Sequence, residues 1–215
     1  MQPDLIFTLL ILFVSVILHE VAHGYMADWL GDPTARLEGR LTLNPISHID
    51  PVGTIILPLL LVLSNSPFFI GYAKPVPYNP YNLPGKYDEP LVAFAGPATN
   101  ILLAIIFGLT IRFAGAALGA SLLSAFATIV YINLMLALFN LVPLPPLDGS
   151  KVLGGIFTAI SANLARGYET FLINFQRIGM LPMILLIMLI VNFILWPLIT
   201  PVLQGMFVLL TGASI

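Results

Sequence analysis

Two histidines and a glutamate near residue 20 have the types and the spacing that metal-assisted hydrolysis requires. They stand in the run His19-Glu20-Val21-Ala22-His23. Residues four apart lie on one face of a helix, so both imidazoles can reach one ion, and Glu20 can act as general base toward an attacking water. The chain has no cysteine, which excludes thiolate ligands and disulfides. Any further ligand must therefore be a histidine or a carboxylate.

A third protein ligand is expected, because a catalytic zinc ion takes three protein ligands and leaves its fourth position to water. Asp148 is the preferred candidate, since it follows the apolar run that ends near Val142, and the prolines before it would end that helix. An Asp-Gly pair after prolines is an ordinary turn by itself, and the missing ligand favours the metal interpretation. His48 and Asp50 are rival ligands, but they lie in a polar loop.

The elements that must position these residues are membrane helices. Hydrophobic residues make up 59% of the 215 and charged residues 8%, with a mean hydropathy of +1.00. So few charges cannot cover a water-facing surface. The apolar run before His19 amounts to about 21 Å of helix, which puts the cluster inside a hydrocarbon core about 30 Å thick. Ionisable groups at that depth are costly unless they pair or bind an ion. The alternative is a polar patch that helps spans pack together, but such a patch would not need this order and spacing.

We expect an all-α polytopic membrane protein with about five to six transmembrane helices, forming a single domain over 1–215 with its catalytic core at about 5–153. The apolar segment 52–63 is too short to cross and contains a proline, so it is predicted to be re-entrant. Alternating leucines predict a small β element near 36–43 on the cytoplasmic side. The block 180–210 is either one kinked span or two. The net charge is −2 and no basic stripe suggests nucleic acid, so no nucleic-acid partner is expected.

Metal geometry and charge predict the same topology. For His19 and Asp148 to meet, the span that carries His19 and the span that ends near Val142 must end on one side of the membrane, which requires that 52–63 does not cross. Seven of the eight basic residues then lie on the side of the site, and Arg112 lies on the other. That asymmetry is typical of a cytoplasmic side.

Taken together, these motifs resemble the site-2 protease family of intramembrane zinc metalloproteases, in its short prokaryotic form without a PDZ or CBS domain. The resemblance covers about 5–153, and its matching stretches occur in the expected order. They are His19-Glu20-Val21-Ala22-His23, Ala95-Gly96-Pro97-Ala98-Thr99-Asn100, the run from Asn140 to Asp148-Gly149, and the segments 43–53 and 71–80.

The resemblance implies one zinc ion per chain, held by His19, His23 and Asp148, with Glu20 as the base. It also implies cleavage of a membrane-protein substrate in or beside its transmembrane helix, as in regulated intramembrane proteolysis. The protein would be multi-pass in a prokaryotic cell membrane, with the active site toward the cytoplasm.

Two asparagines are further candidates for the site. Asn140 and Asn100 are expected to contact the substrate, with interhelical hydrogen bonding as the alternative for each. The substrate segment is expected to bind as an extended strand along 36–43. The sequence encodes neither the substrate nor the oligomeric state.

Two other functions compete with proteolysis. A divalent-metal transporter would distribute ionisable groups along several spans, whereas here these groups collect at one depth. A catalytically inactive scaffold would have no need of Glu20 beside an intact set of ligands. Zinc uptake into vesicles would indicate the transporter, and chelator-sensitive cleavage would exclude the scaffold.

Overall fold

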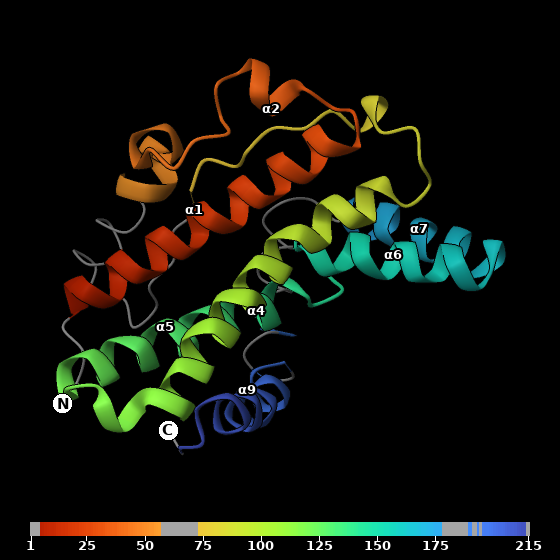
Figure 1. Ribbon diagram of the computed structural model, residues 1–215. Coiled ribbons are helices and arrows are strands. Elements are labelled where there is room, and N and C mark those ends of the chain that lie inside the picture. The colour runs from red at the N-terminus through yellow and green to blue at the C-terminus, as the bar shows by residue number, and fades with distance from the viewer. Residues whose placement is uncertain (1–4, 57–72, 178–188, 191–192, 194, 214–215) are drawn as a thin grey trace.

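The computed structural model describes residues 5–56, 73–177, 189, 190, 193 and 195–213, and every regular element among them is a helix (Figure 1). The α-helices are α1 (Leu5–Leu30), α2 (Thr34–Leu37), α4 (Asp88–Ala114), α5 (Ala120–Asn140), α6 (Asp148–Ile160), α7 (Ala162–Gln176) and α9 (Trp196–Thr211). The remaining helices are the π-helix η2 (Pro51–Ile56) and the 3₁₀-helices η1 (Pro45–His48), η3 (Pro80–Asn82) and η4 (Gly115–Ala117). The predicted all-α class is confirmed for the described residues.

Within the described part of the chain, three helices are long and apolar enough to cross a membrane, namely Leu5–Leu30, Asp88–Ala117 and Ala120–Asn140. A multi-pass membrane protein is therefore the architecture that the chain supports. The predicted total of five to six spans stays a prediction. Segment 52–63 is described only as far as η2, and most of 180–195 lies outside the described residues.

The three long helices pack so that their site-bearing ends meet. In Figure 1, α4 runs back along α1 and α5 runs back along α4, which places the start of α6 beside the C-terminal half of α1. At the opposite end, α9 packs on α4 and α5. The buried side chains there are Ala104, Ile111, Val130, Leu134, Leu203 and Phe207. Arg112 lies at this opposite end, where its guanidinium donates to the Leu209 carbonyl.

The predicted β element at 36–43 is wrong. Residues Thr34–Leu37 form α2, and a turn follows in which Gly39 has φ +64°. A positive φ suits glycine and reverses the chain, so no strand can continue through it. Leu37 and Leu43 are 80% and 62% exposed, so the alternating leucines do not face a common core. The residues that the structure describes contain no strand with which the period-two pattern could pair.

A non-helical segment, 73–79, runs beside α1 and is fixed by side chains from the preceding loop (Figure 1). The Arg40 guanidinium donates to the Lys74 and Pro75 carbonyls over 3.0 and 3.2 Å. The Asn79 N–H donates to the Asp32 carboxylate over 2.6 Å. These bonds place the segment against the C-terminal half of α1.

The buried Asp32 carboxylate ties the end of α1 to this segment. Burial alone would raise its pKa, but hydrogen bonds from Thr34, Asn82 and Asn79 outweigh burial and lower the pKa. The Thr34 hydroxyl and the Asn82 amide donate to Oδ1 over 2.5 and 2.8 Å. Asp32 therefore stays ionised and holds the segment in place.

Candidate metal centre

Helix α1 brings His19 and His23 together, as their spacing predicts. The two side chains lie one helical turn apart, their ring centroids are 4.6 Å apart, and their Nε2 atoms are 3.0 Å apart. Both residues are buried. The polar ends of the imidazoles therefore point at one place within an otherwise apolar helix.

Asp148 joins them from a distant part of the chain. It is the first residue of α6, and its Oδ2 atom lies 3.2 Å from His19 Nε2 and 3.4 Å from His23 Nε2. The turn between α5 and α6 that brings it there depends on Gly149, because a Cβ at that position would lie 2.2 Å from the Leu141 carbonyl oxygen. The expected partnership of Asp148 with the two histidines is thus present in the structure.

The rival ligands lie elsewhere and have other partners. His48 is fully buried, and its Nε2 hydrogen-bonds the Thr42 carbonyl over 2.8 Å. The Asp50 carboxylate accepts hydrogen bonds from the Val52 and Gly53 N–H groups over 2.9 and 2.7 Å. Asp50 therefore caps the start of η2. Neither residue is part of the cluster of possible metal ligands.

The hydrogen bonds on the far sides of the rings determine which nitrogens carry protons. His19 Nδ1 lies 2.6 Å from the Asn100 Oδ1 atom, and His23 Nδ1 lies 2.6 Å from the Val92 carbonyl oxygen. Both partners are oxygens that only accept, so each Nδ1 must carry a hydrogen. A neutral imidazole then has a lone pair on Nε2. Two nitrogen lone pairs and a carboxylate oxygen then converge, and a cation bound between them would relieve their repulsion.

The cluster fits a zinc ion. In a tetrahedral site with metal–nitrogen bonds of about 2.0–2.1 Å, neighbouring ligand atoms are about 3.3 Å apart. The three observed separations are 3.0, 3.2 and 3.4 Å. Gly96 of α4 leaves the space open, since a Cβ there would lie 2.4 Å from His23 Nε2 and 2.6 Å from His19 Nε2. The Asp148 side chain is 20% exposed, so the cluster is not sealed on that side.

Glu20 is held by backbone from the segment 73–79. Its Oε2 atom accepts a hydrogen bond from the Val76 N–H over 3.0 Å, and Val76 is buried against α1. The carboxylate is next to His19 in the chain, in the position that the sequence predicts for a base. No pattern in the sequence indicated that Val76 would orient it.

The two candidate substrate-binding asparagines differ in their surroundings. Asn140, the last residue of α5, is half-buried and donates to the Leu136 carbonyl over 2.9 Å. Asn100 is fully buried, and both ends of its amide are engaged: Oδ1 by His19, and Nδ2 by the Asn133 Oδ1 atom over 2.8 Å. This arrangement favours the interhelical alternative for Asn100 over a substrate contact. Asn133 was not identified from the sequence as part of this site. The signal available was an asparagine within an apolar span.

A second polar cluster holds α6 against α4 and the segment 73–79. The Lys151 ammonium lies 3.2 Å from a Glu89 carboxylate oxygen and contacts the Tyr78 hydroxyl, which donates to Glu89 over 3.1 Å. Burial lowers the pKa of Lys151, but the hydrogen bond to Tyr78 and the charge of Glu89 outweigh it, so the pKa is raised. Lys151 lies one turn after Asp148. This cluster therefore helps to fix the start of α6.

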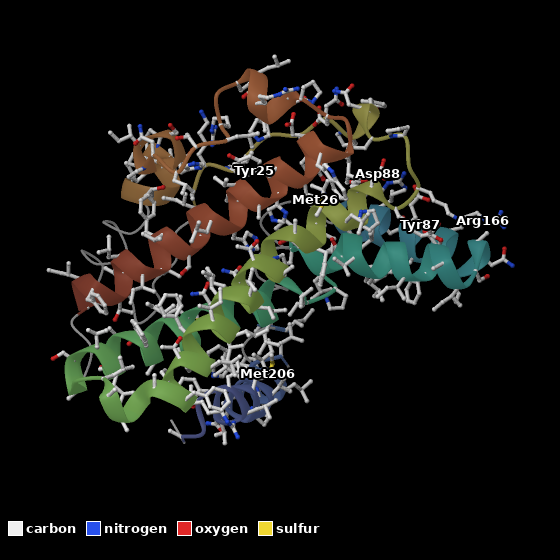
Figure 2. All side chains as sticks on the ribbon, in the orientation of Figure 1. Tyr25, Met26, Tyr87, Asp88, Arg166 and Met206 are labelled. Atoms are coloured by element: carbon white, nitrogen blue, oxygen red, sulfur yellow. The ribbon has the colours of Figure 1, made fainter. Side chains whose placement is uncertain are left out.

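An apolar groove of about 530 Å³ opens between α1 and α4 beside the cluster. It is lined by Ala22, Tyr25, Met26, Trp29, Ala95, Ala98, Thr99 and Leu102. Figure 2 shows Tyr25 and Met26 on the C-terminal half of α1, the half that also carries His23. Trp29 is 79% exposed. The surface next to the candidate metal ligands is thus largely apolar.

Comparison with known proteins gives a consistent picture. The model of peptidase family M50 matches residues 108–186. YwhC of Bacillus subtilis, assigned by its name to the zinc metalloproteases, is 39% identical over 190 residues, which are 81% of each chain. Rip2 of Mycolicibacterium smegmatis, named in the same way, is 32% identical over 63% of this chain and 51% of its own. Zinc metalloprotease MJ0392 of Methanocaldococcus jannaschii is 26% identical over 86% of this chain and 47% of its own. No solved structure matches the chain significantly.

Proposed function

Because the chain belongs to peptidase family M50 and is a zinc metalloprotease, we propose that it hydrolyses peptide bonds in or next to the transmembrane helices of membrane proteins. One zinc ion per chain would be held by His19, His23 and Asp148. The observation that carries this proposal is the convergence of two imidazole lone pairs and a carboxylate oxygen, 3.0–3.4 Å apart, between apolar helices.

Each polar group at the site then has a role. Bound zinc supplies Lewis acidity, which polarises the scissile carbonyl and acidifies water. Glu20 takes a proton from the attacking water and passes it to the leaving amine. The Val76 N–H fixes the orientation of that carboxylate. Asn140, at the end of α5, stays our candidate for contact with the substrate.

The apolar groove between α1 and α4 supports a substrate that arrives from the lipid. Peptide bonds must be exposed before they can be cut, so the substrate helix has to unwind locally. An unwound backbone in lipid needs hydrogen-bond partners. Segment 36–43 forms α2 and a turn, so it supplies no such strand edge. In the segment 73–79 beside Glu20, the Lys74, Val76 and Asn79 N–H groups are already bonded and the two prolines have none, so the substrate backbone must find most of its partners elsewhere.

The distribution of charge supports an active site on the cytoplasmic side of a prokaryotic cell membrane. The proposed protease is one domain, with its catalytic core at about 5–153. Arg112 lies at the end of the helices away from the site. Arg40, Lys74 and Lys151 all lie at the same end as the metal ligands. Such an excess of basic residues is typical of the cytoplasmic side.

A metal transporter is the weaker alternative. A transport path needs further ligands along the helices, and the described residues contain one cluster of possible ligands, His19, His23 and Asp148. That cluster lies beside a carboxylate that is held by a backbone N–H. This is an arrangement for proton transfer at a fixed site.

The test is cleavage of a model transmembrane substrate by the purified protein in detergent or liposomes. Cleavage should stop when a zinc chelator is added and return when zinc is restored. Glu20→Gln should retain zinc and the fold while losing cleavage. A Glu20→Gln variant with full activity would remove Glu20 as the base, and chelator-resistant cleavage would remove zinc from the reaction.

A further inference from the structure

Three polar side chains form a chain of hydrogen bonds behind the metal ligand His19. Asn133 of α5 donates from Nδ2 to the Ile129 carbonyl over 2.9 Å and to the Ser15 hydroxyl over 3.0 Å. Its Oδ1 atom accepts from Asn100 Nδ2 over 2.8 Å, and Asn100 Oδ1 accepts from His19 Nδ1 over 2.6 Å. Asn100 and Asn133 are completely buried. This row of hydrogen bonds therefore links α5, α4 and α1 out of contact with solvent.

The direction of this chain is fixed at its far end. The Ile129 carbonyl oxygen only accepts hydrogen bonds, so the Asn133 amide must turn its Nδ2 toward it. The Asn133 Oδ1 atom then faces Asn100, so Asn100 must donate to it from Nδ2. That orientation leaves the Asn100 oxygen facing His19. His19 Nδ1 must carry a hydrogen, and its Nε2 is left with a lone pair toward Asp148 and His23.

We infer that Asn133, acting through Asn100, is a positioning residue that sets the tautomer of His19 for metal binding. This inference rests on the proposed role of His19 as a zinc ligand. Ligand histidines are commonly oriented by a hydrogen bond on the ring nitrogen opposite the metal. Here the orienting group is itself oriented, by an amide on a different helix.

We call the hydrogen bonds from Asn133 to Asn100 and from Asn100 to His19 the relay. Removing the relay changes the group that faces His19 Nδ1. In Asn133→Leu the Asn100 Nδ2 atom loses its acceptor, and its amide is free to turn and donate to His19 Nδ1. The ring would then place its hydrogen on Nε2, which cannot bind a metal in that form. Loss of such orienting contacts typically weakens metal binding by about 10–100-fold.

Asn133→Asp is the matched variant. A carboxyl oxygen still accepts from Asn100, so His19 should keep its tautomer and zinc affinity should stay close to that of the wild type. Ser15→Ala is the second control, because the Ile129 carbonyl alone still orients the Asn133 amide. Its expected effect on zinc affinity and tautomer is small.

The experiment measures zinc affinity by chelator competition, and the histidine tautomers by ¹⁵N NMR of the zinc-free protein in detergent. The chain has three histidines, so substituting His23 and His48 in turn assigns the His19 signals. We expect a hydrogen on Nδ1 in the wild type, in Asn133→Asp and in Ser15→Ala. In Asn133→Leu we expect it to shift toward Nε2, with zinc binding weakened about 10–100-fold.

Several results would overturn the relay. The first is an unchanged His19 tautomer in Asn133→Leu, whatever its zinc affinity. The second is Asn133→Asp behaving like Asn133→Leu. The third is wild-type His19 with its hydrogen on Nε2, which NMR of the wild type can detect even if Asn133→Leu does not fold. His19→Ala measured in the same series separates this inference from the proposed function. Full zinc affinity in His19→Ala would remove His19 as a ligand, whereas full affinity and an unchanged tautomer in Asn133→Leu alone would remove only the relay.

Discussion

Replacing Gly96 by alanine should displace the proposed metal ligands while leaving the identity of each ligand unchanged. The added Cβ would lie 2.4 Å from His23 Nε2 and 2.6 Å from His19 Nε2, short of an ordinary 3.4 Å contact by about 1.0 and 0.8 Å. Zinc sites tolerate bond-length changes of about 0.2 Å. At least one imidazole must therefore leave its position.

The expected cost in zinc affinity exceeds that of losing an orienting contact, which is about 10–100-fold. We expect at least about 100-fold weaker binding in Gly96→Ala, equivalent to about 2.8 kcal/mol. Chelator competition on the purified protein measures this, and circular dichroism checks that the helices are retained. Gly205→Ala in α9 is the control, because no described atom lies within 4 Å of its added Cβ. Unchanged zinc affinity in Gly96→Ala would refute the geometry proposed for the ligands.

Three further predictions concern the surroundings of the site. Gly149→Ala should lose zinc and cleavage, because its Cβ would lie 2.2 Å from the Leu141 carbonyl oxygen; Gly154→Ala, whose Cβ would make an ordinary 3.7 Å contact, should keep both, and equal zinc content in the two variants would contradict this. Asp32→Asn should lower the free energy of unfolding by about 1–3 kcal/mol at pH 7. Hydrogen bonds lower the Asp32 pKa in the folded protein. The stability that this carboxylate contributes is therefore fully present above its unfolded pKa of about 3.9 and is lost as the pH falls through the folded pKa. Thermal unfolding should show the stability difference between wild type and Asp32→Asn shrinking at low pH, and a constant difference would be contrary evidence. Lys151→Met should loosen the start of α6 and reduce cleavage while Asp148 remains, with Lys86→Met as the control, and equal rates in the two variants would count against this role.

The clustering of the three candidate metal ligands could be predicted from sequence because each constraint on them is local or topological. The spacing of His19 and His23 follows from helical geometry, and the depth of the cluster follows from the apolar run before it. Asp148 was identified because few carboxylates lie at the end of a span. The contacts of Asp148 with both histidines agree with that prediction.

The parts that sequence could not predict depend on contacts between distant segments. The leucines near 36–43 alternate as in a strand, but the Asp32 hydrogen bonds to Thr34 and the positive φ of Gly39 produce α2 and a turn instead. The link from Val76 to Glu20 is a backbone bond, which leaves no mark on side-chain pattern. Asn100 was expected to contact the substrate, and only the packing of α4 on α1 and α5 shows that both ends of its amide are engaged within the protein.

The most direct test of the account is zinc-edge X-ray absorption on the zinc-loaded wild type and on Asp148→Ala, together with zinc content. The wild type should show two imidazole nitrogens at about 2.0–2.1 Å and a carboxylate oxygen at about 2.0–2.2 Å. Asp148→Ala should lose the carboxylate contribution and most of its zinc. Stoichiometric zinc with an unchanged spectrum in Asp148→Ala would show that a different residue completes the site.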